Sequence, residues 1–369
     1  MEHRRLLCST SADKCRKWIK GSGVKKVELV PGYQISPVIK GGWQLSAGHS
    51  LDRKIDDEGA INDTTSFIES GISTLDFGDI YVGVEELIGT ALKRLTDRHG
   101  EDARKMVQLH TKYVPNESSL AEYDLRDVSQ IVDRSLTRLG VEQVDLVQFH
   151  WWRYEEPHYL DAMAELFALK DEGKIRHVGI TNFDLARTRE ITDAGLRPAS
   201  TQVQYSLLDR RVEGGLGQYC HQNGIGIIAF GTVAGGFISE KYLGKGEPDE
   251  FATRSNVKYK LIIDDFGGWE LFQELLKLLD LIAKNHSTDI ASISSAWSLQ
   301  RLGVKAVIVG ARNPDHLERN LGIPKIVFTQ EELAAIDRLL EQSTGPTGEV
   351  YELERYSDRH RGIIHTNNN

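Results

Sequence analysis

Short apolar runs alternate with amphipathic stretches along most of the chain. Runs such as VDLVQFH and GIGIIAFG are continuous in Val, Ile and Leu, a pattern typical of strands buried on both faces. Between the runs, apolar residues recur every three or four positions, as in DLRDVSQIVDRSLTRLG, which predicts a helix ending at a left-handed Gly140. HYLDAMAELFALKDEG ends in the same way at Gly173. Strand followed by helix, repeated many times, predicts parallel strands joined by crossovers.

The number of strands decides between the two folds that this alternation allows, an open doubly wound sheet and a closed barrel. Strand candidates fall near residues 38–42, 72–76, 106–111, 145–149, 176–180, 201–204, 226–230 and 305–309. Eight strands predict a (β/α)8 TIM barrel of the α/β class. No Gly-x-Gly-x-x-Gly turn follows an early strand, although an open nucleotide-binding sheet is expected to show one.

Three further segments complete the predicted organisation. KVELVPGYQISP contains two short β-like pieces, which predict an N-terminal β-hairpin that closes the barrel bottom. Residues 235–268 form the longest irregular stretch and are predicted to be a loop that contacts substrate or cofactor. We assign 26–342 to the barrel with its C-terminal helix, and 343–369, which begins with Gly and Pro breakers, to a C-terminal extension. Residues 1–25 are rich in Lys and Arg and are predicted to be a flexible basic extension, with an organellar targeting segment as the alternative.

Composition narrows the function. The chain has 369 residues, is 40% hydrophobic and carries a formal charge of −9, which argues against a basic surface for nucleic acid. No apolar run is long enough to span a bilayer. Cys8, Cys15 and Cys220 show no metal-ligand spacing and suit a reducing compartment. We therefore expect a cytoplasmic protein that acts on a small molecule, without metal, membrane or nucleic-acid partners; its oligomeric state is left open.

Candidate chemistry gathers at the carboxyl ends of the predicted strands, where the sites of such barrels lie. Asp76 and Tyr81 come from STLDFGDIYVGVEELIG, Lys112 from QLHTK and His150 from VDLVQFH. Taken singly, each residue has an ordinary structural explanation. Together, an ammonium at Lys112 is expected to lower the pKa of the Tyr81 phenol, with Asp76 as the counter-ion of the lysine. This set, with His150 orienting an oxygen, predicts proton transfer at an alcohol or carbonyl group.

The motifs LDFGDIY, TK, VDLVQFH, GITNF, TQVQYSLLDRR, IIAFG and VIVGARNPDHLERN occur in this order between Val27 and Leu340. In this order the set resembles the aldo-keto reductase superfamily. The resemblance implies a (β/α)8 barrel, a nicotinamide cofactor across the carboxyl-end mouth, and a catalytic tetrad of Asp76, Tyr81, Lys112 and His150.

The resemblance also implies cofactor contacts. Thr181, Asn182 and Gln202 match the residues that hold the nicotinamide carboxamide, and Phe230 takes the place of a stacking Tyr. Arg312 suits a phosphate, so NADPH is expected, with NADH as the alternative because Gly310 and His316 depart from the usual pattern. The implied cofactor-binding residues are Gly41, Gly42, Trp43, Asp76, Thr181, Asn182, Gln202, Phe230, Gly231, Thr232, Gly310, Arg312, His316 and Asn320.

Aromatic residues near the mouth predict a pocket for apolar or ring-containing carbonyls, and sugars also stack on tryptophan. The expected substrate contacts are Trp43, Tyr81, Tyr113, His150 and Trp151, while Trp152 could instead pack under a loop. The expected activity is NAD(P)H-dependent reduction of an aldehyde or ketone, with Tyr81 as proton donor and hydride from nicotinamide C4. The alternatives are an NAD(P)+-dependent dehydrogenase of a sugar or pyridoxal-like alcohol, and a cofactor-sensing regulatory subunit resembling potassium-channel β subunits.

Overall fold

The structure, a computed structural model, describes residues 25–47, 49, 56–310 and 314–362. Eight parallel strands close into a barrel in the order β10-β3-β4-β5-β6-β7-β8-β9, so the predicted fold is confirmed. The strands are β3 (Val38–Gly41), β4 (Thr74–Asp76), β5 (Gln108–Tyr113), β6 (Val144–Phe149), β7 (Ile175–Thr181), β8 (Ser200–Gln204), β9 (Gly226–Phe230) and β10 (Val304–Gly310). Each overlaps one of the predicted strands.

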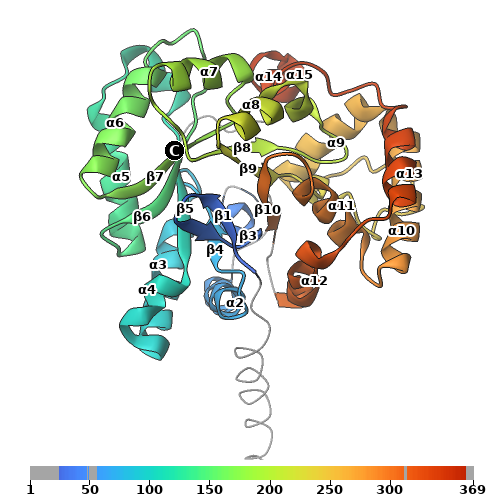
Figure 1. Cartoon of the computed structure of the whole chain (residues 1–369), viewed down its shortest axis with the longest axis horizontal. Helices are drawn as coiled ribbons and strands as arrows, with labels where there is room; N and C mark the ends of the chain where they lie inside the picture. Colours follow the sequence, from blue (N-terminus) through green and yellow to red (C-terminus); the bar gives the residue numbers. More distant parts are fainter. Residues whose placement is uncertain (1–24, 48, 50–55, 311–313, 363–369) are drawn as a thin grey trace, which may run out of the picture.

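Helices surround the barrel (Figure 1). They are α2 (Asp57–Glu69), α3 (Val84–His99), α4 (Ala103–Met106), α5 (Arg126–Leu139), α6 (Tyr159–Asp171), α7 (Leu185–Asp193), α8 (Leu216–Gln222), α9 (Arg254–Phe266), α10 (Gly268–Asn285), α11 (Ile290–Leu299), α12 (Leu317–Gly322), α13 (Gln330–Leu340), α14 (Glu352–Tyr356) and α15 (Asp358–Arg361). The predicted C-cap of α5 is present, because Gly140 has φ 66° and its N–H bonds back to the last turn.

The prediction of an irregular loop over residues 235–268 is wrong, because this stretch contains α9. The Thr253 side chain accepts a hydrogen bond from the backbone N–H of Asn256 and so caps the helix. Ile262, Ile263 and Phe266 lie on its buried face. A Thr cap before apolar residues three and four positions apart was therefore a readable helix signal.

The predicted N-terminal hairpin is present. Strands β1 (Val27–Val30) and β2 (Tyr33–Ile35) pair antiparallel. The buried side chains of Leu29 and Tyr33 form one apolar cluster with residues of the barrel strands, among them Leu146 and Ile228. At Gly226 of β9 a Cβ atom would lie 2.5 Å from the Leu29 side chain, so the hairpin fits closely against the start of that strand. The hairpin thus covers the amino end of the barrel.

The chain beyond α13 folds back onto the barrel. Helix α13 begins with a capping box between Thr329 and Glu332. After it, Tyr351, Glu354 and Arg355 are buried. The domain limits drawn from the sequence stay predictions, and the predicted N-terminal extension lies outside the described residues apart from its last residue.

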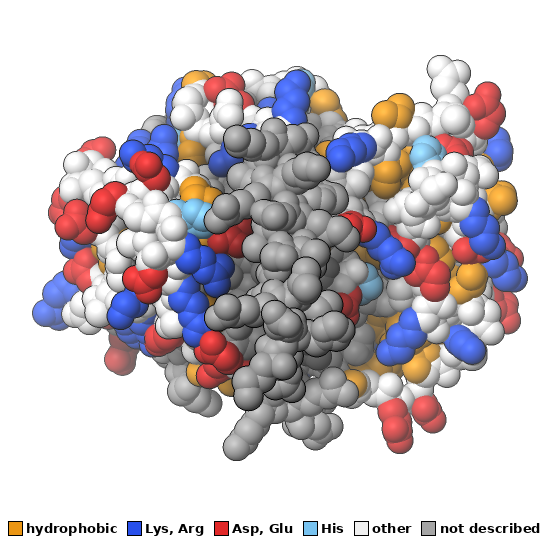
Figure 2. All heavy atoms as spheres, turned by 90° about the horizontal axis from the view of Figure 1, so that it is seen from below, with side chains coloured by type: hydrophobic (Ala, Val, Ile, Leu, Met, Phe, Trp, Pro, Cys, Tyr) orange, Lys and Arg blue, Asp and Glu red, His pale blue; other side chains and the backbone are white. Residues whose placement is uncertain are grey.

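Figure 2 shows one face of the molecule, on which Lys and Arg side chains are interspersed with Asp and Glu. Within the described ranges, no helix combines the length and the apolar character needed to cross a membrane.

Candidate active site

A cavity of about 620 Å³, hereafter the carboxyl-end cavity, lies where the barrel strands end. Its lining includes the last residues of five strands, namely Gly41 of β3, Asp76 of β4, Thr181 of β7, Phe230 of β9 and Gly310 of β10. The parallel arrangement brings these residues together because all eight strands end at the same face of the barrel. The structure therefore places the predicted strand-end residues around one space.

Asp76 and Lys112 form a buried ion pair in this cavity. Lys112 Nζ donates to Asp76 Oδ1 at 2.6 Å and to the Phe77 carbonyl oxygen at 2.7 Å. Both charged side chains are at most 6% exposed. Burial alone would lower the pKa of Lys112, but the neighbouring Asp76 and Tyr81 outweigh burial and raise that pKa. The ammonium is thus held charged beside the phenol.

The second carboxylate oxygen of Asp76 is held by two glutamines. Gln148 Nε2 donates to Asp76 Oδ2 at 2.8 Å, and Gln202 Nε2 donates to the same oxygen at 2.6 Å. Gln148 is fully buried on β6, two residues before His150. The sequence analysis missed Gln148, although the alternation of side chains along a strand places it on the same inward face as His150.

The Tyr81 phenol lies next to Lys112, whose Nζ is 5.1 Å from the ring centroid. Burial raises the pKa of Tyr81, the Lys112 charge lowers it by less, and Asp76 adds to the rise. The expectation that Lys112 brings this pKa below its ordinary value is therefore wrong. The physical reason is that burial of the phenol outweighs the lysine charge. The phenol consequently stays protonated at neutral pH and is available as a donor.

His150 also lines the cavity and is 3% exposed. Its Nδ1 lies 3.2 Å from the Thr181 carbonyl oxygen. Burial, with a smaller contribution from the guanidinium of Arg355, lowers the pKa of the imidazole to about 3. The ring edges meet Trp152 and Tyr351, with centroids 4.3 and 5.4 Å apart.

The structure gathers most of the residues implied to bind the cofactor. Gly42 is buried beside the cavity, where its N–H donates to the Asp76 carbonyl oxygen at 2.7 Å. Arg312 lies outside the described residues. The others line the cavity: Gly41, Trp43, Asp76, Thr181, Asn182, Gln202, Phe230, Gly231, Thr232, Gly310, His316 and Asn320.

Two features of this lining fit a nicotinamide carboxamide. Asn182 Oδ1 is buried and has no hydrogen-bond partner among the described residues, so it can accept from an amide N–H. Asn182 has φ 62°, a left-handed conformation that Asn tolerates. The partly buried ring of Phe230 lies on the same cavity, with Lys258 Nζ 5.3 Å from its centroid.

The structure places three of the five predicted substrate-contact residues on the carboxyl-end cavity. Trp43, Tyr81 and His150 line the cavity, whereas Tyr113 and Trp151 do not. Tyr113 is fully buried in the core and its hydroxyl lies 2.6 Å from that of Tyr123, while Trp151 Nε1 donates to the Glu156 carbonyl oxygen. Side chains alternate along strands, so the neighbours of the inward Lys112 and His150 point outward.

Trp152, which the sequence left between two interpretations, does line the cavity. Its Nε1 donates to the Pro115 carbonyl oxygen at 2.7 Å, so it offers the cavity its ring instead of a donor. Tyr351, Ser255 and Lys258 also line the cavity and were missed. Tyr351 arrives from the C-terminal segment, and no local sequence signal marks it as part of a site.

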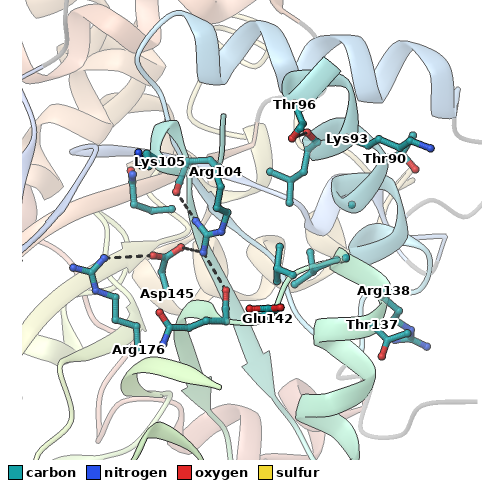
Figure 3. A pocket seen from close by; sticks show the side chains of 18 of the residues that line it. Thr90, Lys93, Thr96, Arg104, Lys105, Thr137, Arg138, Glu142, Asp145 and Arg176 are labelled. Atoms are coloured by element: carbon teal, nitrogen blue, oxygen red, sulfur yellow. Dashed lines mark hydrogen bonds and ion pairs between the residues drawn. The ribbon is translucent and has the colours of Figure 1, made fainter. Parts of the chain in front are cut away.

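A second pocket, of about 1190 Å³, lies at the amino end of the barrel. Figure 3 shows Asp145 between Arg104 and Arg176. Arg104 donates to Asp145 Oδ2 at 2.8 Å and to the carbonyl oxygens of Val107 and Gln143. Arg176 lies 3.8 Å from Asp145 Oδ1. In this pocket Asp145 is thus paired with both arginines.

A profile of the aldo/keto reductase family matches residues 37–341. Together with the barrel and its strand-end residues, this match shows that the chain belongs to the aldo/keto reductase family, a family of oxidoreductases.

Individual relatives are distant. The chain is 30% identical over 214 residues to L-glyceraldehyde 3-phosphate reductase of Escherichia coli O157:H7, an alignment covering 56% of this chain and 61% of that protein. It is 23% identical over 344 residues to the NADH-specific methylglyoxal reductase of Escherichia coli K12, covering 86% of this chain and 99% of that protein.

Solved structures agree on the fold. A thermostable aldo-keto reductase in complex with the inhibitor epalrestat superposes with a TM-score of 0.67 at 26% identity, covering 85% of this chain and 99% of the other. The glycerol dehydrogenase AKR11B4 from Gluconobacter oxydans gives a TM-score of 0.71 at 22% identity, over 88% of this chain and 97% of the other.

Proposed function

We propose that the protein reduces a small aldehyde or ketone to an alcohol with a nicotinamide cofactor, and that Tyr81 donates the proton. The observation that carries this proposal is the buried Lys112 ammonium, held at 2.6 Å by Asp76 and lying 5.1 Å from the centroid of the Tyr81 ring. A phenol next to a fixed positive charge can release its proton to a developing alkoxide, because the charge stabilises the phenolate left behind.

The bound cofactor supplies the hydride that the carbonyl carbon receives. The chain's residues do the rest. Asp76, held by the two glutamines, fixes the Lys112 ammonium, which lies 5.1 Å from the centroid of the Tyr81 ring. Tyr81 holds its proton until negative charge develops on the substrate oxygen. The developing alkoxide is then protonated where it forms.

Asn182 and Phe230 are the residues that we propose to hold the nicotinamide end of the cofactor. The unpaired Asn182 Oδ1 accepts from the carboxamide, and the Phe230 ring offers a flat apolar face. Gln202 Nε2 is engaged by Asp76. We therefore assign Gln202 to the support of Asp76 as well as to the edge of the cofactor site.

We propose NADPH as the preferred cofactor, on the strength of Arg312 in the sequence. His316, Arg319 and Asn320 line the carboxyl-end cavity, and Arg319 Nη1 donates to Asp289 at 3.0 Å. The methylglyoxal reductase relative is named as NADH-specific, so the preference must be measured. Arg312→Ala is expected to weaken NADPH binding about tenfold and NADH binding little, because only NADPH carries the 2′-phosphate. Equal losses would remove Arg312 from phosphate recognition.

The test of the function is NADPH and NADH consumption by the purified protein with a panel of small aldehydes and ketones. A cofactor-binding titration by protein fluorescence accompanies it. We expect turnover with several carbonyls and saturable cofactor binding. Cofactor binding without turnover of any carbonyl or of the matching alcohols would contradict the proposed enzyme activity and favour a cofactor-sensing role.

A further inference from the structure

The guanidinium of Arg355 joins two loops at the carboxyl end of the barrel. Arg355 lies on α14 and is 5% exposed. Its Nη2 donates to the Trp151 carbonyl oxygen at 2.8 Å and its Nε to that of Trp152 at 3.2 Å, both just after β6. Its Nη1 donates at 2.8 Å to the carbonyl oxygen of Asn182, the residue after β7. The planar fork of one arginine thus ties the β6 and β7 loops to the C-terminal segment.

Two tyrosine rings pack against this guanidinium. Arg355 Cζ lies 4.1 Å from the ring centroid of Tyr154 and 5.2 Å from that of Tyr351, distances at which an aromatic ring attracts a cation. The Tyr154 hydroxyl accepts from the backbone N–H of Asp184 at 3.1 Å, so this ring also connects the β6 loop to the β7 loop. The guanidinium is therefore held in place by rings as well as by hydrogen bonds.

The backbone of Asn182 is held from both sides. Its N–H donates to the Gln202 carbonyl oxygen at 2.9 Å, and its carbonyl oxygen accepts from Arg355. Asn182 has φ 62°, and a non-glycine residue keeps this left-handed conformation where its surroundings impose it. Because both flanking peptide groups are fixed, the direction of the Asn182 side chain is set. Asn182 lines the carboxyl-end cavity, and its buried Oδ1 has no hydrogen-bond partner among the described residues.

A separate cluster of charges holds α14 itself. Glu354, the neighbour of Arg355, forms ion pairs with Arg211 Nη1 at 3.2 Å and with Lys258 Nζ at 3.4 Å. Arg211 in turn pairs with Asp209 at 2.7 Å. Removal of the Arg355 guanidinium is therefore expected to leave α14 attached to the barrel and to release the two loops.

We propose that Arg355 is a positioning residue for the nicotinamide end of the cofactor. It holds the Asn182 backbone in the conformation that directs Oδ1 towards the carboxamide. This inference rests on the proposed function, in which Asn182 accepts from the carboxamide N–H. Arg355 acts through Asn182, because its own donors are engaged by the loops and it is not among the described residues that line the cavity.

Two ligands that differ only in the nicotinamide ring test the proposal on the full-length protein. NADP+ carries the ring, and 2′-phospho-ADP-ribose lacks it and keeps the rest of the molecule. Isothermal titration calorimetry gives the Kd of both without any turnover. In Arg355→Met we expect the Kd of NADP+ to rise about tenfold, because the hydrogen bond from the carboxamide to Asn182 is misaligned. The Kd of 2′-phospho-ADP-ribose is expected to stay within twofold of wild type, which also shows that the variant is folded.

The same loss is expected for NAD+, with ADP-ribose as its matched fragment, because the nicotinamide end is common to both cofactors. Arg312→Ala is expected to act differently, since the 2′-phosphate is at the other end of the molecule. Equal losses for NADP+ and 2′-phospho-ADP-ribose in Arg355→Met would therefore overturn the proposal, and so would an unchanged Kd of NADP+.

A control and a conservative variant exclude a general effect on the segment. Arg359 on α15 donates to Asp265 at 2.6 Å and to Asp264 at 2.9 Å, both on α9, so Arg359→Met is expected to change neither Kd more than twofold. Arg355→Lys keeps the charge without the planar fork and is expected to lose NADP+ affinity as Arg355→Met does. Wild-type NADP+ affinity in Arg355→Lys would assign the effect to charge and overturn the proposed positioning.

The wild type alone separates this proposal from the proposed function. A wild type that binds neither NADP+ nor NAD+ would refute the proposed function and this inference with it. A wild type that binds NADP+ more tightly than 2′-phospho-ADP-ribose, with the same ratio of Kd values in Arg355→Met, would overturn the role of Arg355 and leave the proposed function standing.

Discussion

The two ends of the barrel contain the same types of residue, but these residues contact one another differently at each end. At the amino end, Asp145 pairs with Arg104 at 2.8 Å, and the Tyr33 hydroxyl lies 2.8 Å from His110 Nε2. At the carboxyl end, Asp76 pairs with Lys112 and a Tyr and a His lie nearby.

The difference lies in what the tyrosine faces. Tyr33 is 2% exposed at the edge of the amino-end pocket, and Arg176 lies 5.0 Å from its ring centroid, but its hydroxyl is engaged by His110 Nε2 at 2.8 Å. Tyr81 faces the carboxyl-end cavity and a lysine whose pKa is raised. A tyrosine beside a cation therefore does not make an acid site unless its hydroxyl is left to face a ligand.

Lys112→Met is expected to reduce carbonyl reduction about a thousandfold, because it removes the charge that stabilises the Tyr81 phenolate. It also removes the influence that lowers the pKa of Tyr81, so that pKa rises further above its ordinary value. Alcohol oxidation needs the phenolate, and its rise with pH is therefore expected to move to higher pH in the variant. The measurement is kcat for both directions between pH 6 and 10. A lower kcat with an unchanged pH dependence would show that Lys112 does not influence the pKa of Tyr81.

Asp76→Asn and Asp145→Asn form a matched pair, one at each end of the barrel. Asp76→Asn leaves the Lys112 ammonium without its counter-ion and is expected to lower kcat on the order of a hundredfold. Asp145→Asn weakens the Arg104 pair and is expected to cost about 1–3 kcal/mol of unfolding free energy, with kcat within twofold of wild type. Urea unfolding and kcat on both proteins check this. Similar kcat losses for the two would erase the distinction between the ends.

Gln148→Leu tests whether the glutamine positions Asp76. We expect about a tenfold loss in kcat with little change in cofactor affinity, since one of the three donors to the Asp76 side chain is removed. Gln143→Leu is the control, because Gln143 Nε2 donates to the Gly173 carbonyl oxygen at the amino end. A cofactor-affinity loss as large as the kcat loss would assign Gln148 to binding instead of positioning.

We expect Glu354 to make the unfolding free energy depend on pH, although this residue has no proposed role in the reaction. Burial favours the neutral acid, but Lys258 and Arg211 outweigh burial and lower the pKa of Glu354 from 4.5 to about 2. A lowered pKa in the folded state stabilises above pH 4.5, and this stabilisation is lost as the pH falls towards 2. We expect about 2 kcal/mol of unfolding free energy to be lost from this group between pH 6 and pH 3. Glu354→Gln should lack that part of the dependence, and identical pH curves for the two proteins would contradict the assignment.

The sequence was informative wherever local pattern and strand order decide position. The eight strands, the hairpin and the α5 cap follow from apolar runs and turn residues, and Asp76 with Lys112 follows from the rule that such barrels place chemistry at strand ends. The alternation of side chains along β5 and β6 also predicts that Tyr113 and Trp151 point outward, away from the cavity to which they were assigned. The helix α9 was missed in the same way.

Other features depend on distant contacts and could not be read from the sequence. Tyr351 reaches His150 only because the segment after α13 folds back over the barrel, and Gln148 meets Asp76 across 72 positions in the sequence. The pKa of Tyr81 depends on how burial, Lys112 and Asp76 balance, which residue types alone do not reveal. The 3.2 Å contact of His150 Nδ1 likewise depends on where the Thr181 carbonyl oxygen lies.

The central claim is that Tyr81 delivers the proton and that the similar residues at the amino end do not. The most direct measurement is the consumption of NADPH and NADH with a reactive carbonyl by wild type, Tyr81→Phe and Tyr33→Phe, with cofactor affinity measured on all three. We predict that Tyr81→Phe loses at least a thousandfold in kcat at nearly unchanged cofactor affinity, because it removes the acid and leaves the binding residues. Tyr33→Phe is expected to keep wild-type kcat and to lose about 1–3 kcal/mol of stability from its bond to His110. Undiminished turnover by Tyr81→Phe would contradict the account.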